Sequence, residues 1–378
     1  MQLSFSLPLV GECIRPCESS SDDPDGPAVR TEKYKAMLSV GENVLLAPTE
    51  NISHKRLAEI SRDDEFAQLC AETTRLTDEY AGNTAIVGGL IAPSADEKYN
   101  SGIFESLYFD YLEKITVLKD SGADFIMLAN AGTLGEMRAA VLASKAADIP
   151  VFITMNCDEN GKNRSGTDYI AALITLQSIG AAAFGIECMQ GAEAAAGLLK
   201  AALVHAEIPL ILTGSLTGRN KKQMADVLDC GAGIFFNTGP ALDEQTVQAI
   251  KKYSYRFDFD AQKDCYAAAV DSEAFFLSDD IVLSEPITCS YGLDEDMIDL
   301  DDENINSVYI ELFSTDDAAI LADNSDMTRL PVTVHTNDST TLEAALRYFR
   351  GRLIIDTRCD IDDDDLNALA KKYGAILY

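Results

Sequence analysis

The sequence predicts an α/β protein, with a (β/α)8 TIM barrel followed by a smaller α/β module. Eight short apolar runs alternate with amphipathic helical stretches between residues 3 and 252, which suits a barrel of about 250 residues. The runs are continuous and rich in Val, Ile and Phe, as expected for strands buried on both faces. The Gly-rich dinucleotide fingerprint is absent after the first run, which disfavours an open doubly wound sheet.

The eight runs follow one another as barrel strands should. From the N-terminus they read LSFSLPLVG, NVLLAPT, TAIVGGLIAP, ADFIMLAN, PVFITMN, AAFGIEC, IPLILTG and AGIFFNT. The helices between them have recognisable ends. Thr133 and Glu136 form a capping-box pattern, and Gly180 follows TDYIAALITLQSI as a C-terminal stop. We therefore place the barrel at residues 1–252.

The composition changes after the barrel. The segment up to about residue 300 is acidic and weakly periodic, which indicates a linker with one or two strands. The βα alternation then resumes with four strand-like runs, SVYIELF, LPVTVHT, RLIIDTR and AILY, too few for a second barrel. The aspartates at 362–365 are interpreted as a helix start, because carboxylates are favoured at that end of the dipole. Residues 253–378 are therefore predicted to form an acidic linker and a small α/β module.

The charge and the cysteine content restrict the possible partners of the protein and its possible location in the cell. The formal net charge of -32 disfavours nucleic acid and anionic membranes, which both require basic patches. No apolar run approaches the roughly 18 residues of a membrane span, and the N-terminus lacks the positive region of a signal peptide. Nine cysteines at irregular spacing indicate reduced thiols, so we expect a cytoplasmic protein. The oligomeric state is not indicated.

Polar, acidic and thiol side chains occur at the ends of the predicted strands. In a barrel of this class, active sites lie at the C-terminal ends of the strands. The candidate substrate-binding residues at these ends are Asn130, Asn156, Glu187 and Asn237. Three cysteines, Cys13, Cys157 and Cys188, also fall at strand ends, which is more than expected of small core residues alone.

One long segment carries a resemblance to a known family. GADFIMLANAGTLGEMRAAVLASKAADIPVFITMNCDENGKNRSGTD resembles the homocysteine S-methyltransferase family, which includes the first barrel of cobalamin-dependent methionine synthase. AAFGIECMQG is similar to the family's Gly-Ile-Asn-Cys-x-x-Gly, and the resemblance covers about residues 40–250. It implies a (β/α)8 barrel that transfers a methyl group to homocysteine, a small thiol amino acid, in methionine biosynthesis.

The tail resembles part of a second barrel. LPVTVHTNDSTTLEAALRYFRGRLIIDTR is similar to the pterin-binding barrel that follows the homocysteine barrel in methionine synthase. Only about half of such a barrel fits between residue 270 and the C-terminus. The resemblance implies that cobalamin or folate is met only on a partner, such as a corrinoid protein.

The resemblance also implies a zinc ion held by three protein thiolates. Zinc lowers the pKa of the homocysteine thiol and holds its sulfur toward the methyl donor. Cys188 stands at the first ligand position, but GAGIFFNTG lacks the paired cysteines of the family's eighth strand. Two of the three expected ligands are therefore missing. Cys13 and Cys157, together with Cys188, are the candidate replacement ligands for a zinc site in this chain.

Three functions remain open at this point. The first is a divergent methyltransferase acting on homocysteine or another small thiol or amino acid. The second is a metal-free relative that binds a ligand or docks a corrinoid protein without turnover. The third is metal-free acid–base chemistry by Glu12, Glu50, Asp158 and Glu187, each of which also suits a cap, a turn or a solvated surface.

Overall fold

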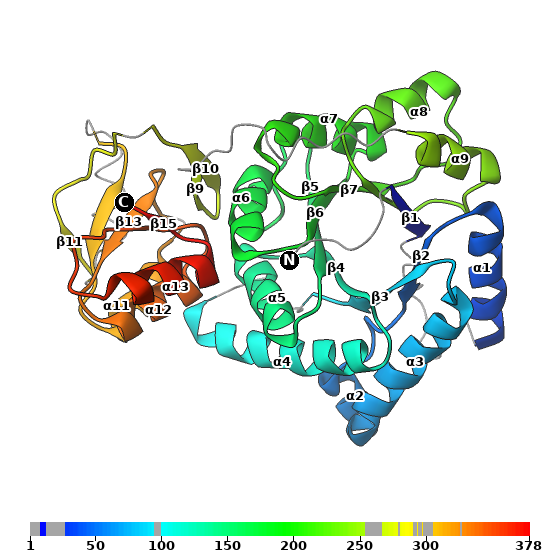
Figure 1. Cartoon of the computed structure of the whole chain (residues 1–378), viewed down its shortest axis with the longest axis horizontal. Coiled ribbons are helices and arrows are strands. Elements are labelled where there is room, and N and C mark those ends of the chain that lie inside the picture. The colour runs from blue at the N-terminus through cyan, green and yellow to red at the C-terminus, as the bar shows by residue number, and fades with distance from the viewer. Residues whose placement is uncertain are drawn as a thin grey trace.

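The barrel comes first along the chain in a computed structural model (Figure 1), which describes residues 8–12, 27–93, 100–253, 267–278, 280–289, 293, 297, 305–325 and 327–378. Eight parallel strands pair in the order β1-β8-β7-β6-β5-β4-β3-β2. They are β1 (Leu9–Glu12), β2 (Val44–Ala47), β3 (Ile86–Ile91), β4 (Phe125–Ala131), β5 (Val151–Cys157), β6 (Ala183–Cys188), β7 (Leu210–Gly214) and β8 (Ile234–Asn237). The predicted (β/α)8 barrel is confirmed.

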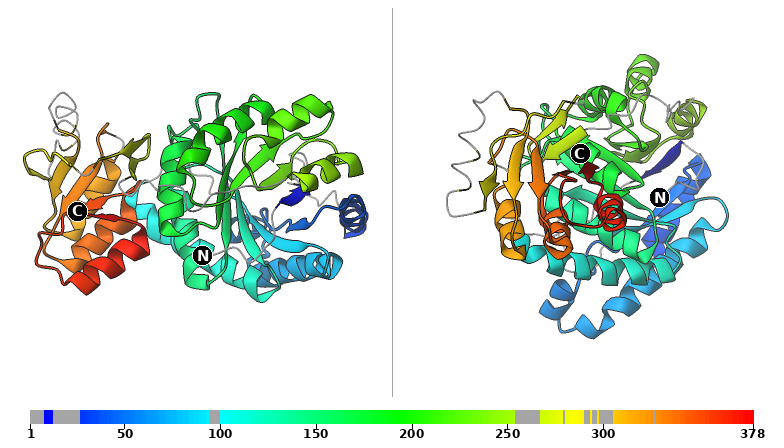
Figure 2. Two further views of the ribbon diagram at one scale, coloured as in Figure 1. Left: turned by 45° about the horizontal axis from the view of Figure 1, so that its top comes forward. Right: turned by 60° about the vertical axis from the view of Figure 1, so that its left-hand side comes forward.

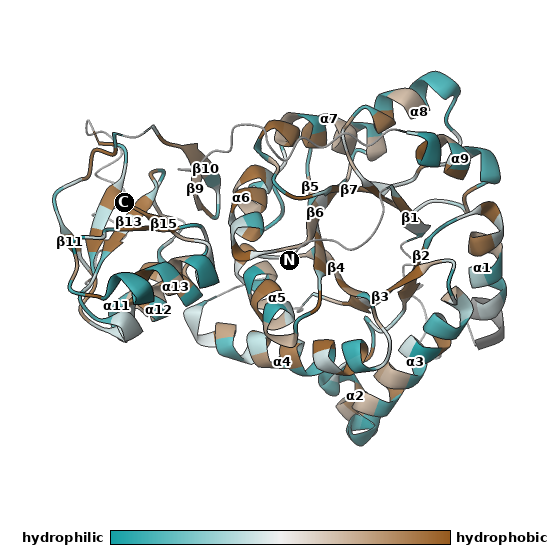
Figure 3. Ribbon diagram, viewed as in Figure 1, coloured by the Kyte–Doolittle hydropathy of each residue, from teal (hydrophilic) through white to brown (hydrophobic). Residues whose placement is uncertain are grey.

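Helices surround this sheet. They are α1 (Pro27–Val40), α2 (His54–Glu59), α3 (Phe66–Ala81), α4 (Ser101–Asp120), α5 (Leu134–Ala147), α6 (Tyr169–Ile179), α7 (Ala192–Ala202), α8 (Lys221–Leu228) and α9 (Glu244–Lys252). Figure 3 shows apolar residues concentrated in the strands and polar residues on outer helices such as α8 and α9. Among the helices of the described ranges, none combines the length and apolar character that a membrane span requires.

Two helix ends test the sequence prediction directly. The Thr133 hydroxyl accepts a hydrogen bond from the Glu136 backbone N–H at 3.2 Å, so Thr133 is the N-cap of α5. The Glu136 carboxylate does not complete the predicted box, because it accepts from the Gly132 N–H at 3.1 Å. Gly180 ends α6 in a left-handed conformation with φ of 115°, as predicted.

The barrel wall is nearly closed. Strands β1 and β2 meet without a paired ladder, and Asn43 bridges them. Its backbone N–H donates to the Val10 carbonyl at 3.0 Å, and its side-chain oxygen accepts from the Val10 N–H at 2.7 Å. An amide side chain thus supplies part of the hydrogen bonding that a continuous sheet supplies elsewhere.

Two separate apolar layers show which way each strand residue faces. The barrel interior is filled by Leu9, Val44, Leu46, Leu90, Phe125, Met127, Phe152, Ala182, Ala183, Ile211, Ile234 and Phe236. The rings of Phe125 and Phe152 stack there with centroids 4.3 Å apart. Alternate strand residues, including Ile126, Ile153 and Leu212, join the helices in a larger outer layer. Facing therefore alternates along each strand, as in other barrels.

Gly185, in the middle of β6, is required by this close packing. An added Cβ would lie 2.0 Å from the Ile211 carbonyl oxygen. We expect Gly185→Ala to lower the free energy of unfolding by about 2 kcal/mol, measured by urea denaturation. Gly197→Ala in α7 is the matched control, because a Cβ there meets nothing within 4 Å. That variant should gain about 0.5–1 kcal/mol, and equal losses in both would contradict the packing argument.

The C-terminal part contains a hairpin and a five-stranded parallel sheet in sequential order, β11-β12-β13-β14-β15. Its elements are β9 (Ala267–Val270), β10 (Glu273–Phe276), β11 (Ile287–Thr288), β12 (Val308–Glu311), α11 (Thr315–Asp323), β13 (Val332–His335), α12 (Ser339–Tyr348), β14 (Ile354–Ile355), α13 (Asp363–Tyr373) and β15 (Ile376–Leu377). The Asp362 side chain caps α13, as predicted. The division of the chain at residue 252 stays a prediction.

This module lies beside α4, α5 and α6 of the barrel (Figures 1 and 2). Arg347 of α12 pairs with Glu105 of α4 at 2.5 Å. The buried Arg138 of α5 donates to the carbonyl of Leu346 at 2.5 Å. Lys145 at the end of α5 donates to the carbonyl of Lys372 at 3.0 Å. Charged side chains of the barrel thus bond to the backbone and side chains of the module.

Candidate functional site

A row of inward-facing residues crosses the C-terminal mouth of the barrel. Asn156 of β5 is in register with Glu187 of β6, and Glu187 is in register with Thr213 of β7. Each lies an even number of residues beyond an interior residue of its own strand, Phe152, Ala183 or Ile211. Their side chains therefore point toward the barrel axis. Asn156 is exposed, Glu187 is half-buried and Thr213 is buried.

Two oxygens at this mouth are buried without a partner. Within the described residues, Asn130 Oδ1 and Thr213 Oγ1 have no hydrogen-bond partner. Asn130 sits at an irregularity near the end of β4 with φ of 59°, a left-handed conformation that only Gly and Asn adopt readily. Its backbone N–H donates to the Thr154 hydroxyl at 3.1 Å. Buried oxygens are normally paired, and the position of these two at strand ends makes them candidate ligand contacts.

Asn237 has a different environment. Its side-chain oxygen accepts from the Leu216 N–H at 3.0 Å, and its NH2 donates to the Pro240 carbonyl at 2.8 Å. Asn237 therefore fixes the loop after β8. Glu12 at the end of β1 similarly accepts from the Leu242 N–H at 3.2 Å. A substrate contact of Asn237 stays a prediction.

The thiols at the ends of β5 and β6 lie side by side. Cys157 and Cys188 are paired in register and belong to the outer apolar layer beneath the helices, unlike the inward-facing Glu187. The Cys188 thiol donates to the Gln190 side-chain oxygen at 3.0 Å. Burial, together with the neighbouring Cys188, raises the pKa of the Cys157 thiol to about 12. Cys157 is therefore protonated at neutral pH in the metal-free protein, and a metal ion would have to displace this proton to bind the thiolate.

The donors among the described residues do not form the three-thiolate zinc centre that the resemblance implies. Cys13 lies outside the described residues. Across the ranges that the structure describes, no three His, Cys, Asp or Glu side chains are grouped to hold a metal ion. The cysteines described are Cys70, Cys157, Cys188, Cys230, Cys289 and Cys359, and none lies on β8. The proposed zinc ligation by Cys13, Cys157 and Cys188 stays a prediction.

The segment 158–168 after β5 borders the mouth and begins with a tight turn. Asp158 Oδ1 accepts from the N–H groups of Asn160 and Lys162 at 2.9 and 3.0 Å, and these bonds lower the pKa of Asp158. Gly161 has φ of 80°, which glycine adopts without strain. The DENG sequence thus forms an Asx-type turn, and Asp158 is engaged in it.

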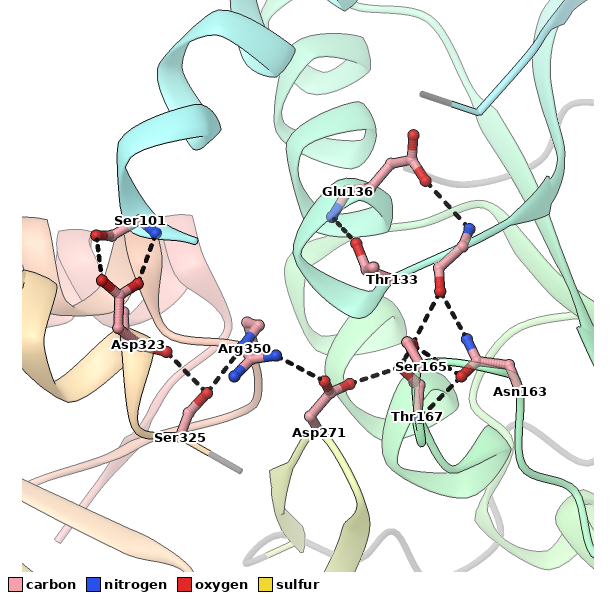
Figure 4. Close-up of polar contacts among 12 residues, drawn as sticks. Ser101, Thr133, Glu136, Asn163, Ser165, Thr167, Asp271, Asp323, Ser325 and Arg350 are labelled. Atoms are coloured by element: carbon pink, nitrogen blue, oxygen red, sulfur yellow. Dashed lines mark hydrogen bonds and ion pairs between the residues drawn. The ribbon is translucent and has the colours of Figure 1, made fainter. Parts of the chain in front are cut away.

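Further contacts join this segment to the loop after β4 (Figure 4). Asn163 Nδ2 and Ser165 Oγ both donate to the Gly132 carbonyl at 2.9 Å. Gly132 follows Asn130 by two residues. The loop that follows Asn130 and the segment that follows β5 are therefore tied together.

Lys114 of α4 also supports the mouth, and it was not among the site residues predicted from the sequence. Its ammonium group donates to the carbonyls of Thr49 and Ile52 at 2.6 Å each, which fixes the loop containing Glu50. Burial lowers the pKa of Lys114 to about 8. The sequence signal that could have indicated a buried Lys114 is its place on the same helical face as Tyr111, Ile115 and Leu118.

A nearly closed barrel with polar side chains at its C-terminal mouth places the chain among (β/α)8 proteins, whose active sites occupy this end. The chain belongs to the homocysteine S-methyltransferase family, because the model of that family matches residues 15–249. The family expected from the sequence is confirmed.

The matches to individual relatives cover only short parts of those proteins. The methionine synthase of Mycobacterium leprae is 29% identical over 106 residues, which are 26% of this chain and 9% of that protein. The Mycobacterium tuberculosis methionine synthase is 30% identical over 106 residues, with the same shares. The match thus spans about a tenth of these curated relatives.

Solved structures share the fold. The metallated form of the homocysteine methyltransferase MmuM from Escherichia coli is 16% identical, covers 66% of this chain and 97% of its own, and superposes with a TM-score of 0.55. Its oxidised form gives 15% identity, the same coverage and a TM-score of 0.53. At this identity the likeness concerns the fold alone.

Proposed function

We propose that the chain is a methyltransferase that binds homocysteine, or a closely related thiol amino acid, at the barrel mouth and methylates its sulfur. The observation that carries this proposal is the pair of buried oxygens without partners in the described residues, Asn130 Oδ1 near the end of β4 and Thr213 Oγ1 in register with Glu187. An amino acid offers an ammonium donor and carboxylate acceptors that match an amide oxygen and a hydroxyl. Membership of the homocysteine S-methyltransferase family adds support.

Each mouth residue has a distinct role in this proposal. The Asn130 amide oxygen accepts a hydrogen bond from the substrate ammonium group. The Thr213 hydroxyl donates to a substrate carboxylate oxygen. Asn156, exposed at the outer end of the same row, contacts the part of the substrate or donor nearest to solvent. The apolar floor, which includes Phe152, excludes water below these polar groups.

Glu187 is the group that activates the substrate thiol in this proposal. A free thiol has a pKa of about 8.5 and is a poor nucleophile while protonated. Glu187 accepts the proton as the S–H bond breaks, and the sulfur attacks the methyl carbon. The bond between the methyl group and the donor then breaks, and its electron pair leaves with the donor. Because the described donors do not fit a three-thiolate zinc centre, no step is assigned to a metal.

The proposal is tested by binding and turnover together. Calorimetric titration with L-homocysteine, with L-serine as control, measures binding. Mass spectrometry measures methionine formed from S-methylmethionine or methylcobalamin, with zinc and with a chelator. Binding with product formation supports the proposal. Binding without product from either donor favours the metal-free relative that binds without turnover, and the absence of binding contradicts both.

Asn130 offers a separable test of substrate contact. Asn130→Gly removes the side-chain oxygen and keeps the left-handed backbone without strain. We expect the Kd for homocysteine to rise about tenfold, as for loss of a hydrogen bond to a charged group, with no loss of thermal stability. Asp148→Gly is the control, because Asp148 is also left-handed, with φ of 53°, but precedes β5 at the opposite end of the barrel. Equal affinity in Asn130→Gly and wild type would remove Asn130 from the site.

A further inference from the structure

Asp271 joins the barrel mouth to the C-terminal module. It lies in the turn between β9 and β10, and its side chain is 4% exposed. Its Oδ1 accepts from the Thr167 hydroxyl at 2.7 Å, and its Oδ2 pairs with Arg350 of the module at 3.2 Å (Figure 4). Its backbone carbonyl accepts from the Asp168 N–H at 3.0 Å. One buried carboxylate therefore contacts two distant parts of the chain.

On the barrel side the contacts continue from Thr167 to the mouth. The Thr167 N–H donates to Asn163 Oδ1 at 2.9 Å, and its hydroxyl lies 3.1 Å from that of Ser165. Asn163 and Ser165 both donate to the Gly132 carbonyl at 2.9 Å. A hydrogen-bonded chain thus runs from Asp271 to the backbone two residues after Asn130.

On the module side the same turn is firmly held. Arg350 also donates to the Ser325 hydroxyl at 3.0 Å, and its side chain is 12% exposed. Arg352 and Ala269 exchange backbone hydrogen bonds of 2.8 and 3.3 Å, which attach β9 to the segment before β14. The position of Asp271 is therefore set by the module together with α6, against which Ala267 and Ala269 of β9 pack.

We propose that Asp271 is a positioning residue for the methyl-acceptor site. The docked module, through the Asp271 carboxylate, holds segment 158–168 and the loop after β4 in the arrangement that orients Asn130. Loops of this kind open locally at low free-energy cost unless they are tied, and binding groups need such support to stay in place. The inference rests on the proposed function only for the identity of the ligand.

A second ion pair of the same interface provides the matched control. Arg347 of α12 pairs with Glu105 of α4 and lies over the rings of Phe104 and Tyr108. None of these four residues belongs to segment 158–168. Arg347→Gln weakens the docking without touching the loop, whereas Asp271→Asn keeps the size of the side chain and removes its charge.

The experiment measures hydrogen exchange and ligand binding in the full chain. In Asp271→Asn, we expect backbone amides of segment 158–168 to exchange about fivefold faster or more, and the Kd for L-homocysteine to rise by a similar factor. KM should rise with kcat nearly unchanged. Thr167→Val, which removes the hydroxyl contacts to Asp271 and Ser165 at nearly constant volume, should also raise the exchange rates and the Kd. Arg347→Gln should leave loop exchange and Kd at their wild-type values.

Two results would overturn the inference. One is unchanged exchange of segment 158–168 in both Asp271→Asn and Thr167→Val. The other is an equal increase in Arg347→Gln, which would assign the effect to docking in general. If Asp271→Asn does not fold, Thr167→Val decides by itself. If the wild type does not bind homocysteine, the proposed function fails, while the exchange rates still support or overturn the positioning role.

Discussion

Replacing Glu187 with glutamine is expected to reduce methyl transfer to homocysteine about 100-fold or more, the usual contribution of a positioned general base. Glutamine keeps the shape of the side chain but cannot accept the thiol proton. The loss should therefore appear in kcat, with the KM for homocysteine changed little. The variant should recover rate as the pH approaches the pKa of the free thiol, about 8.5, because the thiolate then forms without a base.

Steady-state kinetics between pH 6 and 9 check this expectation. Glu193→Gln is the control, since Glu193 lies on α7, the helix after β6, and pairs with Arg219 with about half of its side chain exposed to solvent. It should keep wild-type kcat. A Glu187→Gln variant with wild-type kcat at pH 7 would show that the thiol loses its proton by another route, and the proton acceptor would then have to be sought elsewhere.

Replacing Glu42 with glutamine is expected to stabilise the protein by about 3–5 kcal/mol at pH 8, because each pKa unit is worth about 1.4 kcal/mol. Glu42 is buried, and within the described residues neither of its side-chain oxygens has a hydrogen-bond partner. Burial, with a smaller contribution from the Glu12 carboxylate, raises the pKa of Glu42 from 4.5 to about 8.

The pH dependence follows from that raised pKa. Between pH 4.5 and 8 the unfolded chain has lost this proton and the folded chain keeps it, so wild-type stability falls as pH rises through this window. Urea denaturation across the window should show a shallower fall in Glu42→Gln and a similar stability near pH 4.5. Glu32→Gln, at an exposed position, should leave the wild-type profile unchanged. Parallel profiles for Glu42→Gln and wild type would contradict the argument.

The fold was predictable because each barrel strand is a continuous apolar run between polar helices. The same continuity concealed which residues face the axis, since a run that is apolar on both faces has no alternation to read. Glu187 and Cys188 were therefore both placed at the mouth, yet they face opposite sides of the sheet. A shift of one residue along a strand turns a side chain from the barrel axis to the layer beneath the helices.

Other parts of the site were hidden for different reasons. Asn237 was predicted to bind substrate from its place at a strand end, and its side-chain bonds go to Leu216 and Pro240. Nothing in the sequence distinguishes a loop-holding amide from a ligand-binding one. Asp271 lies in the acidic segment interpreted as a linker, and the sequence carries no signal that distinguishes it from the other aspartates there. Its importance comes from Thr167 and Arg350, which are 104 and 79 residues away.

The Asn43 bridge between β1 and β2 marks the junction of the wall where we expect the barrel diameter to vary most. Seven junctions of the wall are backbone ladders, one of them with an irregularity near the end of β4. Ladders resist stretching because several bonds must lengthen together. The eighth depends on two hydrogen bonds between Asn43 and Val10, one of them to a side-chain amide, so fewer bonds oppose the separation of these two strands. In an eight-stranded ring this junction is diametrically opposite that of β5 and β6. We therefore expect elastic expansion of the wall to be concentrated on the far side from Asn156 and Glu187, whose spacing is set by the β5–β6 ladder.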